Sequence, residues 1–126
     1  MTESPLRVCI VDDDDAVRDS LRILLDAYGI DVEAFPSPSQ FLNEALDKAA
    51  DCLIFDLHMP EMTGLELAEH LRARKLTTPV IIITGRTDPV LAPRMERAGI
   101  AAVLAKPVGD EELVGAIHSA RTAGAR

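Results

Sequence analysis

Short apolar runs alternate along the chain with longer segments in which apolar residues recur at helical spacing. Residues 8–11, 52–55, 80–83 and 103–105 form four such runs, none of which alternates with polar residues. Runs of this kind are typical of parallel strands that are covered on both faces. Residues 30–35 alternate instead, which predicts a fifth strand that lies nearer an edge of the sheet.

The segments between the strands predict five helices. Gly29 follows the first, where a helix end favours positive φ, and Ser37 or Ser39 is a candidate N-cap for the second. Pro93 falls within the fourth and removes a backbone hydrogen bond there, so we expect that helix to start late or to kink. The apolar faces of the other helices contain Val17, Leu21, Leu24, Leu25 and Tyr28, then Phe41, Leu42, Ala45 and Leu46, then Leu67, Ala68 and Leu71, and finally Leu113, Ile117 and Ala120.

This alternation predicts a doubly wound α/β fold, with a five-stranded parallel sheet and helices on both of its faces. A chain of 126 residues is the size of one domain, and we expect the ordered core to run from about residue 6 to residue 121. In such sheets, ligands bind beyond the carboxyl ends of the strands, where the strand order reverses. The functional site should therefore lie at those ends.

Polar residues stand at the carboxyl ends of four predicted strands. Asp12 and Asp13 follow the first strand, Asp56 the third, Thr84 the fourth and Lys106 the fifth. Parallel strands end at the same edge of a sheet, so these side chains should meet on one rim. The next two residues, Asp14 and Asp15, are instead suited to cap the first helix and to face the positive end of its dipole.

Three carboxylates on one rim repel one another, by about 4 kcal/mol per pair at a separation of 4 Å and an effective dielectric near 20. A divalent ion would offset this repulsion, and an oxygen-rich ligand set suits Mg²⁺. The alternative is that Lys106 alone, or raised carboxyl pKa values, neutralises the cluster. Spacing leaves both interpretations open.

Composition excludes several classes of function. A net charge of −8 and an isoelectric point near 4.7 argue against direct nucleic-acid binding, which needs clustered basic residues. The longest apolar run, residues 100–105, is far below the roughly 20 residues that span a bilayer, and the N-terminus lacks a signal pattern. We therefore expect a cytoplasmic protein without membrane contact, in which Cys9 and Cys52 are reduced core thiols.

Four sequence pieces together resemble a known family. The pieces are VDDDD at Asp12–Asp15, FDLHMPEMTGLEL around Asp56, IIITG at Thr84 and AKP at Lys106. In order and spacing they are similar to the receiver domain of two-component response regulators, most of all to receivers joined to helix-turn-helix output domains. The resemblance implies a flavodoxin-like (βα)5 fold with strand order 2-1-3-4-5. It covers residues 6–120, and we expect residues 1–126 to form a single receiver domain with no output domain.

The resemblance implies a phosphoryl-accepting site at Asp56. Its carboxylate would take a phosphoryl group from a phosphohistidine on a sensor histidine kinase or phosphotransfer protein. Mg²⁺, or Mn²⁺, would be held by Asp12, Asp13, Asp56 and the backbone carbonyl of His58. The family is not made up of conventional enzymes, since a receiver catalyses only its own phosphorylation and dephosphorylation.

The resemblance also implies roles for the residues after the last two strands. Thr84, Gly85 and Lys106 would contact the phosphoryl group, with Thr84 signalling its arrival. The Lys106–Pro107 bond would be cis. Residue chemistry alone favours a Thr84 that ends a strand with its hydroxyl bonded to backbone, and the place of Thr84 on the rim is what favours the phosphoryl contact.

Two departures from the family pattern concern output. The position that often holds Tyr or Phe is Val103, and Pro93 interrupts the helix on the same surface. We predict that the aromatic rotamer switch is absent and that output runs through loop movement, partner occlusion or another face. An unknown downstream protein or a phosphorylation-dependent homodimer would receive the signal. The alternative function is a phosphorylation-independent interaction module with a receiver fold.

Overall fold

The computed structural model describes residues 6–46 and 49–124 and contains one parallel five-stranded sheet. The strand order is β2-β1-β3-β4-β5, so the predicted doubly wound topology is confirmed. β2 lies at one edge, as its alternating sequence indicated. The strands are β1 (Arg7–Val11), β2 (Asp31–Phe35), β3 (Cys52–Asp56), β4 (Val80–Thr84) and β5 (Ile100–Ala105).

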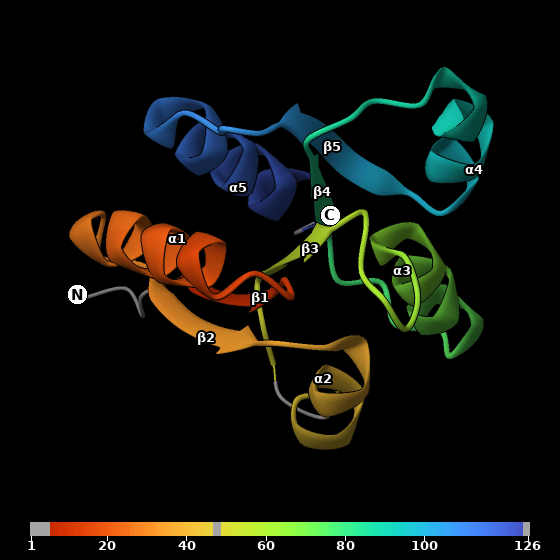
Figure 1. The fold of residues 1–126 in the computed structure, drawn as a ribbon, viewed down its shortest axis with the longest axis horizontal. Helices are drawn as coiled ribbons and strands as arrows, with labels where there is room; N and C mark the ends of the chain where they lie inside the picture. The colour runs from red at the N-terminus through yellow and green to blue at the C-terminus, as the bar shows by residue number, and fades with distance from the viewer. Residues whose placement is uncertain (1–5, 47–48, 125–126) are drawn as a thin grey trace.

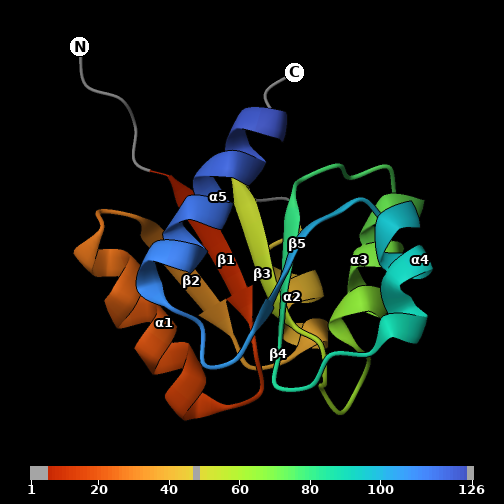
Figure 2. The same cartoon turned by 90° about the horizontal axis from the view of Figure 1, so that it is seen from above.

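Helices cover both faces of the sheet, as Figures 1 and 2 show. The helices α1 (Asp15–Ala27) and α5 (Asp110–Gly124) pack on one face. The other face carries α2 (Pro38–Glu44), α3 (Gly64–Ala73) and α4 (Ala92–Arg97). No helix within the described residues is both long enough and apolar enough to cross a membrane.

Each face of the sheet has its own apolar core, because successive residues of a strand point to opposite faces. In β3, Ile54 packs with Leu21, Leu25 and Ile117 beneath α1 and α5. Its neighbour Phe55 packs on the opposite face, where the rings of Phe35, Phe41 and Phe55 form two edge-to-face pairs. Cys9 and Cys52 are buried on opposite faces, and burial raises the pKa of the Cys52 thiol to about 12, which suits an inert core residue.

The prediction that β5 is covered on both faces was wrong. The strand is longer than expected, beginning at Ile100, and every second residue is exposed. Ala101, Val103 and Ala105 are the exposed positions. The physical reason is the topology, since β5 pairs only with β4 and forms the second edge of the sheet.

Capping residues set the ends of two predicted helices. The Asp14 carboxylate accepts hydrogen bonds from the amides of Ala16 and Val17, at 2.9 and 3.1 Å, so its predicted capping role is confirmed. Gly29 follows α1 with φ +74°. For α2, the N-cap is Ser37 rather than Ser39.

Pro93 shortens the fourth helical segment, as predicted. A 3₁₀ turn (Pro89–Leu91) precedes α4, which starts only at Ala92. Pro93 therefore stands in the first turn of α4, where its missing N–H has no helical partner to lose. The outcome is a late start, and the surface beside β5 carries a helix of only 6 residues.

Candidate functional site

The carboxyl ends of β1 and β3 bring three aspartates together. Asp12 and Asp13 directly follow β1, and Asp56 is the last residue of β3. These strands are neighbours at the point where the strand order reverses. One carboxylate oxygen from each aspartate lies within 4.8 Å of the other two, so the predicted cluster exists.

Lys106 reaches this cluster from the end of β5. Its ammonium nitrogen lies 3.0 Å from Oδ1 of Asp56 and 3.2 Å from Oδ2 of Asp12. The backbone positions it, since the Lys106 amide donates to the Thr84 carbonyl at 2.8 Å. The Lys106–Pro107 bond is cis, as the resemblance implied. Lys106 is therefore not the solvated surface lysine that its sequence alone would allow.

One ammonium group does not balance this cluster. Asp12 is fully buried and Asp56 is 6% exposed. Burial raises the pKa of Asp12, and the nearby Asp56 charge adds to the rise, although hydrogen bonds from the Asp14 amide and Lys106 oppose it. For Lys106, burial alone would lower the pKa, but the hydrogen bond and charge of Asp56, together with Asp12, raise it.

The donor set fits a hard divalent cation. Three acidic side chains face one lysine, and each of the three offers a carboxylate oxygen, which is a hard ligand. Burial raises the pKa of Asp12 even with Lys106 beside it, which is what the alternative of raised carboxyl pKa values predicts. The excess of acidic groups over Lys106 fits a divalent cation, whereas the raised pKa of Asp12 fits the alternative drawn from the sequence.

The remaining predicted residues lie on the same rim with different surroundings. Thr84 is buried, and its hydroxyl donates to the Arg86 carbonyl at 2.6 Å while accepting from the Arg86 amide at 3.1 Å. This is the backbone-bonded arrangement considered above. Gly85 is exposed, and a Cβ there would meet nothing within 4 Å. His58 is also exposed, in the loop between β3 and α3.

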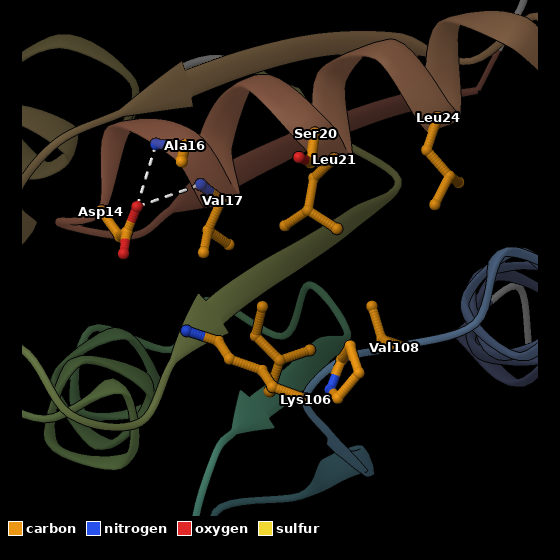
Figure 3. Close-up of a pocket in the computed structure, with 10 residues that line it drawn as sticks. Asp14, Ala16, Val17, Ser20, Leu21, Leu24, Lys106 and Val108 are labelled. Carbon is orange, nitrogen blue, oxygen red and sulfur yellow. Dashed lines mark hydrogen bonds between the residues drawn. The ribbon is translucent and has the colours of Figure 1, made fainter.

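An apolar groove of about 440 Å³ lies beside the site, between α1 and the residues that follow β5. Figure 3 shows Val17, Leu21 and Leu24 of α1 facing Lys106 and Val108 across it. Lys106 therefore belongs both to this groove and to the acidic cluster. A second cavity, of about 420 Å³, lies between α4 and β5 and is lined by both Thr84 and the half-exposed Val103.

Gly64 is a site residue that the sequence interpretation missed. It begins α3 directly above the end of β3, where a Cβ would overlap the Asp56 carbonyl oxygen and stand 3.0 Å from Cβ of Phe55. Its amide also donates to the Leu57 carbonyl at 3.0 Å. The sequence did contain a pattern that predicts this helix start, because Thr63 and Glu66 form a T-x-x-E capping box.

We expect Gly64→Ala to lower the free energy of unfolding by about 1–3 kcal/mol, because backbone atoms must shift to admit the methyl group. Gly115→Ala is the matched control, since it lies in α5 and a Cβ there meets nothing within 4 Å. Urea unfolding of both variants measures the difference. Equal stability of the two would show that the close approach to Asp56 is of no consequence.

A family model for the response regulator receiver domain matches residues 8–118. The response regulator protein TodT of Pseudomonas putida is 39% identical over 120 residues, which cover 95% of this chain and 53% of TodT. Transcriptional regulatory protein FixJ of Azorhizobium caulinodans is 39% identical over 119 residues, which cover 94% of this chain and 56% of FixJ. The chain thus spans about half the length of these relatives.

Solved structures agree with the sequence matches. The structure of FixJ-N superposes with a TM-score of 0.86 at 36% identity, covering 95% of this chain and 96% of that one. The response regulator StyR superposes with a TM-score of 0.88 at 36% identity, covering 97% of this chain and 62% of StyR. The likeness therefore extends over both the fold and the sequence.

Proposed function

The chain belongs to the response regulator receiver family, and on that premise we propose that it accepts a phosphoryl group on Asp56 in a Mg²⁺-dependent reaction. The observation that carries the proposal is the contact of Lys106 with both Asp12 and Asp56 at a cluster of three carboxylates. The donor would be a phosphohistidine of a sensor kinase or phosphotransfer protein, and the reaction would take place in the cytoplasm. A receiver is a signalling module and not a conventional enzyme.

In the proposed reaction, a carboxylate oxygen of Asp56 forms a bond to phosphorus while the phosphorus–nitrogen bond of the donor breaks. The electron pair of that bond stays on the departing imidazole nitrogen, which takes up a proton. Lys106 remains beside Asp56 and balances charge on the phosphoryl oxygens. Dephosphorylation would transfer the same group to water.

Asp12, Asp13 and Asp56, together with the His58 carbonyl, would hold the ion. When bound, Mg²⁺ supplies positive charge that neutralises phosphoryl oxygens and fixes their orientation. Asp12 is already held in place, because its Oδ1 accepts the Asp14 amide at 2.9 Å and its Oδ2 faces Lys106. The apolar groove beside Lys106 offers a partner protein a surface next to the phosphoacceptor.

For output, we propose movement of the loop that follows β4. The Thr84 hydroxyl donates to the Arg86 carbonyl and must release it before it can donate to a phosphoryl oxygen. Release would free the segment from Gly85 to Asp88, next to the cavity lined by Val103. This route needs no aromatic ring at position 103, and a downstream protein or a second copy of the chain would read the change.

The experiment that tests the proposed function is intact-mass analysis after incubation with acetyl phosphate. We expect the mass to rise by one phosphoryl group in the presence of Mg²⁺ and to stay unchanged in EDTA. If acetyl phosphate gives no gain, a phosphohistidine donor is the second probe. Failure with both donors would favour the phosphorylation-independent interaction module.

A further inference from the structure

We infer that Arg18 is a positioning residue for the metal site, because it holds the peptide unit from which Asp13 projects. The inference rests on the proposed function, since it concerns the affinity of the same carboxylate cluster for a divalent ion. Arg18 lies one turn into α1 and does not itself contact the cluster of Asp12, Asp13 and Asp56 carboxylates.

The guanidinium of Arg18 makes two contacts at the start of α1. Nη1 donates to the Asp12 carbonyl oxygen at 2.6 Å, and Nη2 pairs with the Asp15 carboxylate. The Arg18 side chain is 16% exposed whereas Asp15 is 88% exposed, so the arginine is the more buried partner. A planar guanidinium presents donors on separate nitrogens in a fixed geometry, which suits this double contact.

The position of the Asp13 carboxylate depends on the backbone more than the positions of the Asp12 and Asp56 carboxylates do. Asp12 is held through its amide, which donates to Phe35, and through both carboxylate oxygens. Asp56 is the last residue of β3 and faces Lys106. Within residues 6–46 and 49–124, the exposed Asp13 carboxylate has no hydrogen-bond or salt-bridge partner.

The contact with Arg18 fixes that backbone. The Asp12 carbonyl and the Asp13 amide belong to one planar peptide unit, so a hydrogen bond to the carbonyl restrains the plane that directs Asp13. The carbonyl group follows directly after the end of β1, where sheet hydrogen bonding stops. Arg18 therefore supplies the hydrogen bond to the Asp12 carbonyl that a neighbouring strand would supply within the sheet.

Loss of Arg18 should change the affinity for a cation in opposite directions, depending on whether its charge or its positioning of Asp13 matters more. Removing a positive charge near a cation site would strengthen cation binding if charge alone mattered. Losing a group that orients a ligand typically weakens metal binding by 10- to 100-fold. We therefore expect Arg18→Gln to weaken Mn²⁺ binding roughly tenfold. The probe is a Mn²⁺ titration in which the free ion is measured by electron paramagnetic resonance.

Two control variants separate the contacts. Arg22→Gln removes the same charge one turn later on α1 and should change the Mn²⁺ dissociation constant by less than about twofold. Asp15→Asn leaves the contact of Arg18 with the Asp12 carbonyl in place, so it should also stay within about twofold. Arg18→Lys keeps the charge without the planar guanidinium, and we expect weakening of roughly threefold.

Urea unfolding of each variant distinguishes positioning from stability, because a merely structural role would lower the free energy of unfolding without changing the Mn²⁺ dissociation constant of the folded protein. If Arg18→Gln is unfolded, Arg18→Lys provides the test. Unchanged or tighter Mn²⁺ binding by the Arg18 variants would overturn this inference alone. Absence of Mn²⁺ binding by the wild-type protein would overturn the proposed metal site and this inference with it.

Discussion

Asp56→Asn is expected to abolish phosphorylation by acetyl phosphate while leaving the fold intact. The amide oxygen of asparagine is a far weaker nucleophile than a carboxylate and cannot form the acyl phosphate. The substitution also removes one of three clustered carboxylates. We expect the repulsion energy that is relieved at Asp12 and Asp13 to exceed the attraction energy that is lost with Lys106. Without Mg²⁺, we therefore expect the variant to be no less stable than the wild-type protein.

Intact-mass analysis and urea unfolding, both on the same preparation, check the two halves of this prediction. Asp19→Asn is the matched control, because it makes the same exchange at an exposed position of α1. The control should gain one phosphoryl group as the wild-type protein does. A phosphoryl gain by Asp56→Asn would identify a different acceptor, and a marked loss of its stability would mean that the Asp56–Lys106 contact outweighs the repulsion.

The sequence was sufficient to predict the order of strands and helices because buried parallel strands and amphipathic helices differ in period. It was also sufficient at Asp14, where a side-chain oxygen at the start of an apolar-periodic segment caps local amides. It was not sufficient for β5. A short apolar run has the same pattern at a sheet edge and in the centre, so the run at residues 103–105 did not itself indicate exposure, although the strand order implied by the family resemblance places β5 at an edge.

The rim residues were predictable for a related reason, since each follows a strand and parallel strands end at one edge. What those residues contact depends on tertiary structure. The bond from Thr84 to Arg86 follows the path of the loop after β4, and the need for glycine at position 64 arises where α3 starts against β3. The contact of Arg18 with the Asp12 carbonyl likewise needs the turn between β1 and α1, which composition does not reveal.

Lys106→Met is expected to cause the largest loss of stability, about 2–4 kcal/mol at neutral pH without divalent ions, because it leaves two buried carboxylates without their cation. The estimate is reduced from the usual value for a buried pair, since Lys106 is 25% exposed. The raised pKa of Lys106 gives the sign of the pH effect. Its contribution to stability is complete below 10.5, the ordinary lysine pKa, and is lost only as the pH rises through the higher folded-state pKa.

Urea unfolding measures this loss, and Lys75→Met is the control, because it removes the same charge from an exposed residue. The control should stay within about 0.5 kcal/mol of the wild-type protein. Asp12→Asn in the Lys106→Met background should restore much of the stability, since asparagine removes the uncompensated charge and can still accept the Asp14 amide. Wild-type stability of Lys106→Met would show that the cluster does not need the charge of Lys106.

Mg²⁺ should also restore stability to Lys106→Met, because the ion supplies the positive charge that the lysine provided. Binding to the folded state alone adds about 2.7 kcal/mol when the Mg²⁺ concentration is 100 times the dissociation constant. The same variant should still be phosphorylated more slowly, since Mg²⁺ cannot replace the ammonium group beside Asp56. Recovery of stability without recovery of rate would separate the two roles of Lys106, which are to balance the resting cluster and to stabilise charge during transfer.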